Sequence, residues 1–220
     1  MNYREVMREL KSRGTAQNRK VYAKHGAGDK LYGVSFADLR KLQKRIKVDH
    51  ALALELWDSG NMDARTLATM IADTDELKPS TANAWMKEID YYVLSDQLAE
   101  LVARVPFARK KMEQWMKSPR EYYRACGYTT LAVALKNGMD IPDSDCSRYL
   151  SIIQKELHSS PNRARYSMNN AVIAIGIYKP NLTQEAVKTA KKIGKVEVDH
   201  GETNCKTPDA VSYIEKTLKR

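Results

Sequence analysis

One pattern occurs twice in the chain, as SPREYYRACGYTTLAVAL at residues 118–135 and as SPNRARYSMNNAVIAIGI at residues 160–177. Each copy opens with Ser-Pro and runs into an apolar tract at about the same distance from the proline. Proline at the first helical position is common, because its fixed φ suits a helix and its missing N–H has no partner there. Pro79 is also expected to start a helix. Pro79, Pro119 and Pro161 lie 40 and 42 residues apart. The pattern predicts helical units in succession.

Helical spacing of apolar residues extends outward from these copies over most of the chain. Helix starts are expected at Ser35, at Pro142-Asp143 and at Thr183, and glycines stand where helices should end, namely at Gly14, Gly60, Gly138 and Gly194. The nearest candidate for a strand, 195–198, is only a few residues long. A period of about 40–47 residues with two or three helices is typical of HEAT or armadillo-like stacking. We predict an all-α, HEAT-like α-α superhelix (solenoid) of stacked antiparallel helix pairs, as a single domain over 1–220. The alternative is an irregular helical bundle.

Length and composition exclude several classes of protein. The chain has 220 residues, 43% of them hydrophobic, which suffices for one domain with a sizeable core. No apolar run approaches the ~20 residues of a membrane span. The charged N-terminus, MNYREVMRELKSRG, is unlike a secretory signal. Three cysteines without a CxxC spacing indicate neither a disulfide scaffold nor a zinc ribbon. We expect a cytoplasmic monomer that makes no membrane contact.

The charges are segregated along the chain. Residues 1–47 carry 13 basic and 4 acidic side chains, residues 49–103 carry 3 and 11, and residues 104–124 carry 7 and 2. The formal net charge is +10. Blocks of this kind can produce one strongly positive face, which attracts phosphate backbones. We therefore predict a basic concave face that binds DNA, although folding could also mix the blocks.

Familiar catalytic signatures are absent from the sequence. There is no GxxxxGK[ST], GxGxxG or HExxH motif, and the four histidines have no metal-ligand spacing. The segment 198–208, VDHGETNCKTP, gathers Asp199, His200, Glu202 and Cys205. No second ligand cluster completes a site, so a polar turn is favoured over a metal. We expect neither a metal nor another cofactor.

Two segments combine aromatic and charged residues. Tyr92 and Asp96 stand at i and i+4, which places them on one face of a helix, beside Tyr91. Tyr123 and Arg124 follow the basic stretch RKKMEQWMK, and aromatic residues among basic ones suit base stacking and phosphate contact. Position alone favours ordinary roles: tyrosines in the core, Asp96 at a helix dipole, and Arg124 in a salt bridge within a repeat.

From about residue 20 to about residue 180, the chain resembles the bacterial DNA alkylation repair glycosylases, which are built of HEAT-like repeats. The resemblance rests on a YGV turn, on an LW…AR-x-LA run, and on the order and offsets of the Asp96 and Arg124 helices. The residues of the turn and the run are Tyr32, Gly33, Val34, Leu56, Trp57, Ala64, Arg65, Leu67 and Ala68.

The family's cleft holds an aromatic residue followed four residues later by an aspartate, an arginine on a later helix, and a further tryptophan. The resemblance assigns the aspartate to Asp96 and the arginine to Arg124. Tyr92 stands where the family usually has tryptophan. The further tryptophan has no counterpart, because 167–176 contains no aromatic residue and Ile173 falls near its place. These departures weaken one aromatic wall of the cleft, remove another, and leave the expected DNA binding intact.

The resemblance implies a DNA glycosylase that excises cationic N3- or N7-alkylated purines from duplex DNA by hydrolysis of the N-glycosidic bond. Asp96 would be the catalytic carboxylate, and Tyr91 and Tyr92 would form the aromatic lesion cleft. Alkylated or distorted double-stranded DNA would be the partner, at the nucleoid. The expected DNA-binding residues are Arg124, Tyr123, Arg109, Lys110, Lys111 and Arg165. The alternatives are a non-catalytic DNA-binding solenoid for damaged, bent or branched DNA, and a helical repeat that binds protein.

Overall fold

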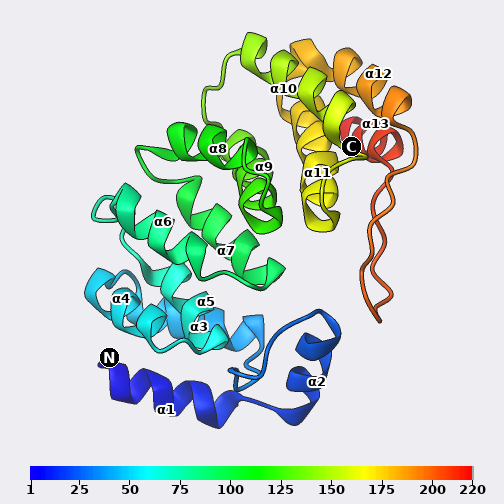
Figure 1. Cartoon of the computed structure of the whole chain (residues 1–220). Helices are drawn as coiled ribbons and strands as arrows, with labels where there is room; N and C mark the ends of the chain where they lie inside the picture. Colours follow the sequence, from blue (N-terminus) through cyan, green and yellow to red (C-terminus); the bar gives the residue numbers. More distant parts are fainter. Residues whose placement is uncertain (220) are drawn as a thin grey trace. The chain divides into compact units, whose positions relative to one another are not determined.

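The computed structural model describes residues 1–219, and this part of the chain contains α-helices and one short 3₁₀ helix but no β-strand (Figure 1). The all-α prediction is confirmed. The elements are α1 (Tyr3–Arg13), α2 (Ala16–Lys24), α3 (Phe36–Ile46), α4 (His50–Asp58), α5 (Met62–Ile71), α6 (Pro79–Lys87), α7 (Tyr92–Val102), α8 (Ala108–Met116), α9 (Glu121–Lys136), α10 (Asp143–Glu156), α11 (Asn162–Tyr178), the 3₁₀ helix η1 (Pro180–Leu182), α12 (Thr183–Ile193) and α13 (Ala210–Leu218).

The helix boundaries follow the local signals of the sequence. The Ser35 hydroxyl accepts a hydrogen bond from the backbone N–H of Asp38 and so caps α3, as expected. Pro142 is the residue before α10, and α12 begins at Thr183. Gly14 and Gly194 follow the last residues of α1 and α12. These starts and stops were predictable because a cap involves only residues within one helical turn.

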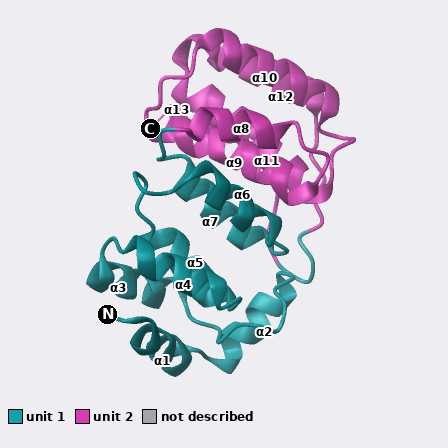
Figure 2. Ribbon diagram, turned by 60° about the vertical axis from the view of Figure 1, so that its left-hand side comes forward, with its two compact units in different colours: residues 1–106, 200–203 teal, residues 107–199, 204–220 magenta. Residues whose placement is uncertain are grey.

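Two compact units make up the chain (Figure 2). Unit 1 comprises Met1–Pro106 together with His200–Thr203, and unit 2 comprises Phe107–Asp199 together with the chain from Asn204 onward. Helices that follow one another through short loops, such as α4 and α5 in unit 1 or α8 and α9 in unit 2, run antiparallel and pack together. The prediction of one domain over 1–220 stays a prediction.

The core of unit 1 lies between α3, α4, α5 and α7. The rings of Trp57 and Trp85 stack with centroids 4.3 Å apart and planes at 4°. The Arg65 guanidinium lies 5.0 Å from the Trp57 ring centroid and pairs with Glu88. Aromatic stacking of this kind adds to the free energy gained by burial. The LW…AR run of the sequence is therefore a packing element.

Unit 2 is built around α9 and α11, which are the two copies of the quoted pattern and pack against each other. Helix α8 approaches α9 at Gly127, where an added Cβ would stand 2.5 Å from the Met116 backbone nitrogen. Cys126, one residue before Gly127, is fully buried. The segment 195–208, between α12 and α13, forms neither helix nor strand (Figure 1).

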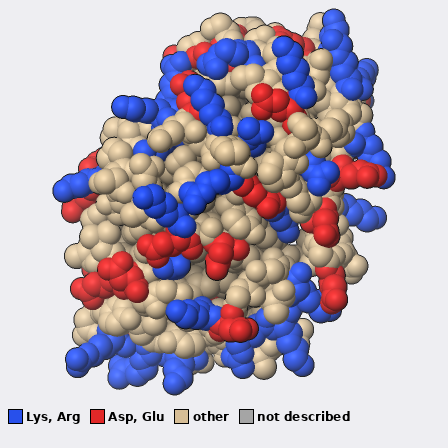
Figure 3. Space-filling model, viewed as in Figure 1, with Lys and Arg blue, Asp and Glu red and all other residues tan. Residues whose placement is uncertain are grey.

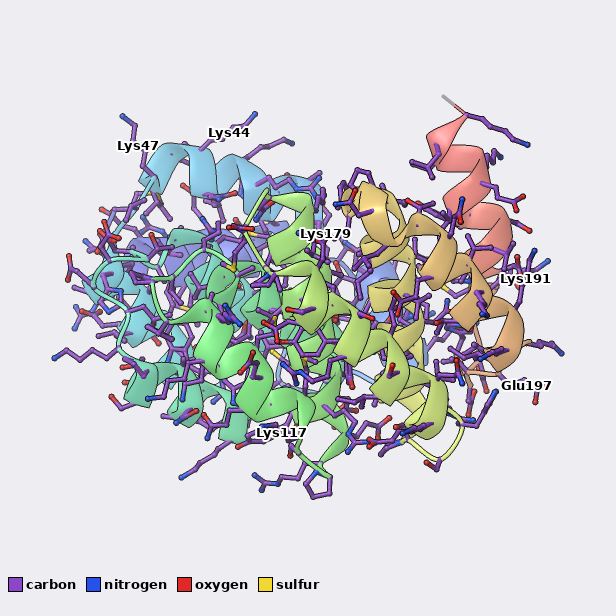
Figure 4. The ribbon with its side chains drawn as sticks, turned by 90° about the horizontal axis from the view of Figure 1, so that it is seen from above. Lys44, Lys47, Lys117, Lys179, Lys191 and Glu197 are labelled. Atoms are coloured by element: carbon purple, nitrogen blue, oxygen red, sulfur yellow. The ribbon has the colours of Figure 1, made fainter. Side chains whose placement is uncertain are left out.

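Basic side chains in unit 1 gather on its first helices. On the face seen in Figure 3, Lys and Arg collect along the lower edge, over α1. Arg4, Arg8 and Lys11 of α1 are exposed. Lys44 of α3 and Lys47, which follows its last residue, point away from the molecule (Figure 4). The basic block 1–47 thus remains a positively charged surface after folding, whereas a concave basic face stays a prediction.

Candidate functional site

Helix α7 carries the aromatic and acidic residues singled out by the sequence. Tyr91 precedes its first turn and is 3% exposed, and Tyr92 is its first residue and is half-buried. The two rings meet edge to face, with centroids 5.3 Å apart. Asp96 lies one turn later on the same face and is also half-buried. The expected helical arrangement of these residues is therefore present.

A cavity of about 140 Å³ opens beside this helix in unit 1. Its walls come from α2, α3, α5 and the start of α7, and they are made mainly of aromatic and aliphatic side chains with one carboxylate. The aromatic and acidic lining residues are Tyr22, His25, Phe36, Asp63, Tyr91 and Tyr92. Asp96 is not among the lining residues, although it shares a helix face with Tyr92. The faces of aromatic rings carry partial negative charge, so a cavity with these walls favours a flat or cationic group.

Two hydrogen bonds hold α2 against this cavity. The Tyr92 hydroxyl and His25 Nδ1 lie 2.7 Å apart, with the donor set by the histidine tautomer. The Tyr22 hydroxyl donates to the Val34 carbonyl at 2.7 Å. Helix α2 buries none of its own residues, so polar contacts replace apolar packing in fixing it. Both tyrosine rings are thereby held in place at the cavity wall.

Asp63 supplies the buried carboxylate of the cavity. It is 1% exposed, and three backbone N–H groups donate to it: Tyr32 at 2.6 Å, Gly33 at 3.0 Å and Val34 at 3.0 Å. Burial raises the pKa of this carboxyl, and the three backbone donors oppose that rise. Gly33 has a φ of +81°, a left-handed conformation that favours glycine. The YGV turn of the sequence is thus shaped by a carboxylate from a helix some thirty residues later.

In unit 2, the Arg124 guanidinium is engaged by neighbouring groups. Its Nε donates to the Ser118 carbonyl at 2.9 Å, and its Nη1 donates to Ser160 Oγ at 3.0 Å and to Glu156 Oε2 at 3.3 Å. The side chain is 16% exposed. The salt bridge within the repeat, which position alone favoured, is therefore present. The Nη2 group of Arg124 is the part of the guanidinium that remains for contact with phosphate.

The basic stretch of α8 divides into exposed and buried members. Arg109 and Lys110 are exposed, and Arg109 pairs with Asp145 and with Glu113. Lys111 is only 6% exposed, and its ammonium donates to Gln114 Oε1 at 3.0 Å. Desolvation, and then the charge of Lys110, lowers the pKa of Lys111. In this conformation Arg109 and Lys110 face solvent and Lys111 does not.

The other predicted DNA contacts in unit 2 are half-buried. The Arg120 guanidinium lies 4.8 Å from the Tyr123 ring centroid, and Tyr123 meets Trp115 edge to face. Arg165 Nη2 donates to Asn162 Oδ1 at 3.4 Å, while its Nε is buried without a hydrogen-bond partner in the described chain. Arg165 is thus the one predicted contact with an unsatisfied buried donor. Ile173, near the place of the family's further tryptophan, is 6% exposed.

Sequence reasoning missed four residues of the unit 1 cavity: Tyr22, His25, Phe36 and Asp63. Tyr22 and His25 are three residues apart at the end of a helix, which is a signal of a shared face. Their partners lie far along the chain, and His25 and Tyr92 are 67 residues apart.

Residues 1–219 contain no group of three or more His, Cys, Asp or Glu side chains placed to hold a metal ion. No helix in that range is long and apolar enough to cross a membrane.

Comparisons with known proteins agree with this architecture. A family model described as "DNA alkylation repair enzyme" matches residues 6–214. Uncharacterised proteins of Listeria innocua and Listeria monocytogenes are each 32% identical, over 96% of this chain and 95% of their own length. A solved structure covers all of this chain and 95% of its own, with a TM-score of 0.91 and 29% identity. It represents a family related to the HEAT-like repeat DNA glycosylases with affinity for branched DNA structures.

Proposed function

The chain belongs to the DNA alkylation repair enzyme family and has its HEAT-like helical fold, and on that premise we propose that it is a DNA glycosylase. Its substrate would be a cationic N3- or N7-alkylated purine in duplex DNA. The observation that carries the proposal is the aromatic cavity at the start of α7, with the Asp96 carboxylate one turn along the same helix face. The reaction needs only water as co-reactant.

The chemistry suits a site without a strong acid. An alkylated purine already carries positive charge, so its glycosidic bond breaks without protonation and the base leaves as a neutral molecule. The sugar develops oxocarbenium character, as in glycoside cleavage generally. A fixed carboxylate near C1′ stabilises that charge and orients the water that adds there, whose proton passes to solvent. We assign this role to Asp96.

Recognition of the lesion would be divided between aromatic residues, which contact the base, and mainly basic residues, which contact phosphate. Tyr91 and Tyr92 would meet the cationic base through their ring faces. Phosphate contacts would come from Arg124, Tyr123, Arg109, Lys110 and Arg165, with Lys111 available only if its side chain leaves Gln114. The protein would act as a monomer at the nucleoid, without a metal or nucleotide cofactor.

A second candidate function is binding of branched or distorted DNA without catalysis. Two observations favour it. Tyr92 replaces the usual tryptophan and Ile173 is a buried aliphatic residue, so the cleft has fewer indole rings than in the family. The similar solved structure belongs to a family with affinity for branched DNA structures. Both functions require a basic surface, and they differ in whether base is released.

The test is single-turnover release of methylated base from alkylated duplex DNA, with binding and melting curves for each protein. Asp96→Asn should leave DNA affinity equal or slightly improved, because one negative charge is lost near phosphate. Its excision rate should fall by ~10²-fold or more, the usual scale for losing one preorganised electrostatic group. Asp90→Asn is the matched control, since Asp90 is exposed just before α7 and loses the same charge.

Arg124→Ala should behave differently and weaken both binding and excision, because the proposed partner of Arg124 is phosphate in every DNA-bound state. Binding is measured well below the melting temperature, since Arg124 also bonds Ser118, Ser160 and Glu156. Wild-type protein that binds alkylated duplex but releases no base would reject the glycosylase and leave the DNA-binding function. Equal rates for wild type and Asp96→Asn would reject Asp96 as the catalytic carboxylate.

A further inference from the structure

Unit 2 contains a second cavity, of about 240 Å³, between α8, α9 and α10. It shares no residue with the cavity of unit 1. Its apolar walls are Met116, Ile152 and the rings of Tyr128 and Tyr149, and its charged groups are Glu113, Lys117, Arg124, Arg148 and Glu156. A water molecule occupies about 30 Å³ of liquid. The cavity therefore has room for a ring-sized organic group as well as a small anion.

Tyr128 brings an unused hydrogen-bonding group to this cavity. The residue is 1% exposed, and its hydroxyl has no hydrogen-bond partner within residues 1–219. The Tyr128 hydroxyl is not among the fully buried polar atoms that lack a partner, so it reaches the open space of the cavity, where a ligand can accept its hydrogen bond. Desolvation raises the pKa of Tyr128 to about 12, against the opposing charge of Arg124. The hydroxyl is therefore protonated at neutral pH and can donate.

Further donors stand beside Tyr128. Arg124 lies one turn earlier on the same face of α9, and its Nη2 group has no partner in the described chain, in contrast to its Nε and Nη1. Lys117 is exposed and forms no ion pair there either. Two charged donors and a neutral one in the lining of the same cavity suit a phosphate.

The acids of the cavity already have partners. Glu113 Oε1 accepts a hydrogen bond from the Tyr149 hydroxyl at 2.7 Å, and Glu156 pairs with Arg124 at 3.3 Å. Arg148 is likewise engaged, by Asp145 at 2.7 Å and by the Tyr149 ring at 4.7 Å. One oxygen of each glutamate is therefore engaged, and the charged residues of the cavity are three cations and two acids, which leaves a net positive charge for an anion.

We propose that this cavity binds a nucleoside monophosphate group, with the phosphate at Arg124, Tyr128 and Lys117 and the ring system against Met116 and Ile152. The group could be a free nucleotide or the 5′-terminal nucleotide of a DNA strand, as occurs at forks and flaps. The second source rests on the DNA binding proposed above, whereas the first does not. The volume admits the ring-bearing ligand, and inorganic phosphate alone would leave most of the cavity to solvent.

The first experiment is calorimetric titration of the full chain with deoxyadenosine 5′-monophosphate, deoxyadenosine and inorganic phosphate. The monophosphate should bind saturably and more tightly than either fragment. Tyr128→Phe removes only the hydroxyl and should weaken binding about tenfold, the scale for a hydrogen bond to a charged group. Tyr213→Phe, the same change at an exposed position of α13, should bind as wild type does.

A second variant guards against a folding defect in Tyr128→Phe. Lys117→Gln changes an exposed residue and should weaken the monophosphate several-fold while leaving deoxyadenosine unaffected. Absence of saturable monophosphate binding to wild type, or equal affinity of wild type and both variants, would overturn the proposal. Failure of base release or of intact-duplex binding tests the proposed function instead, because neither assay supplies a free nucleotide or a strand end in this cavity.

The two sources are separated with flap DNA that carries or lacks a 5′-phosphate. If the strand end is the ligand, the phosphate should strengthen binding to wild type and have no effect on Tyr128→Phe. If flap binding ignores the phosphate while the monophosphate still titrates, the free nucleotide is the ligand. Both results support the site.

Discussion

At the scale of single residues, Asp63 shows how one side chain can shape a distant turn. Its two carboxylate oxygens accept all three backbone N–H groups of Tyr32, Gly33 and Val34. Without it, these donors would be buried or half-buried without partners, which costs more free energy than one ordinary hydrogen bond contributes. This turn also positions Val34, whose carbonyl accepts a hydrogen bond from the Tyr22 hydroxyl at the cavity wall. A structural carboxylate thus supports the candidate site.

We predict that Asp63→Ala lowers the free energy of unfolding by about 3 kcal/mol or more, because several backbone donors lose a charged acceptor. Asp63→Asn should be less severe, since its one amide oxygen can still accept. Urea unfolding monitored by circular dichroism measures both. Asp58→Ala is the control, as Asp58 is exposed on α4 and should change stability by less than about 0.5 kcal/mol. A loss below about 1 kcal/mol in Asp63→Ala would show that the turn holds without this carboxylate.

At the scale of helices, the closest approach in unit 2 is between α8 and α9. Gly127 faces backbone atoms of α8, and an added Cβ would stand 2.5 Å from Met116 N and 3.0 Å from Met112 O. Backbone atoms within a helix cannot move independently to make room. The missing side chain of Gly127 therefore sets the distance between the two helices, and with it the positions of Arg124, about one turn earlier, and of Tyr128, the next residue.

We predict that Gly127→Ala destabilises the protein by roughly 1–3 kcal/mol, the usual cost of overpacking, although alanine is the better helix former. Gly28→Ala is the matched control, because an added Cβ there meets nothing within 4 Å. Thermal melting of both variants measures the effect. A Gly127→Ala protein as stable as wild type would mean that α8 can shift away from α9.

The start of α10 carries acids whose state depends on pH. Asp143 is hydrogen-bonded by Asn181 and Lys179, and Asp145 by Arg148 and Arg109, and these partners lower the pKa of both carboxyls. A folded-state pKa below the unfolded value means that the ionised form is favoured by folding. The stabilisation is therefore present above the unfolded pKa, about 4, and is lost as pH falls through the lower folded values.

We predict that Asp143→Asn/Asp145→Asn lowers the melting temperature near neutral pH and that the gap to wild type narrows on acidification, from about pH 5 downward. Melting curves at a series of pH values measure this gap. Asp90→Asn, which removes an exposed charge outside α10, should show no such convergence. A gap that is constant from pH 7 to about pH 3 would show that these ion pairs contribute no pH-dependent stability.

At the scale of the whole molecule, the excess of basic residues governs association with DNA. The formal charge is +10, and the described ion pairs involve only a minority of the 37 Lys and Arg residues. Cations without acidic neighbours can replace counterions along a phosphate backbone. Binding driven in this way is weakened by salt, because released counterions then gain less entropy.

We predict that the logarithm of the DNA-binding constant falls linearly with the logarithm of salt concentration, with a slope of about −0.9 for each phosphate contacted on duplex DNA. Fluorescence anisotropy from low to physiological ionic strength measures the slope. Lys110→Gln, which alters an exposed residue of α8, should reduce its magnitude by about one. A titration that is flat with salt would contradict electrostatic binding.

The sequence by itself determined the all-helical class and most helix boundaries, because caps, prolines, glycines and apolar spacing act between residues a few positions apart. It also placed Tyr92 and Asp96 on one helix face. Only the tertiary structure decided that Tyr22, His25 and Asp63 join Tyr92 at one cavity, since these residues come from three helices and the bond between His25 and Tyr92 spans 67 residues. It likewise decided that Lys111 is buried while Lys110 is exposed, and that Arg124 is held by Glu156. Burial and pairing depend on which helices meet, and a pattern within one helix does not contain that information.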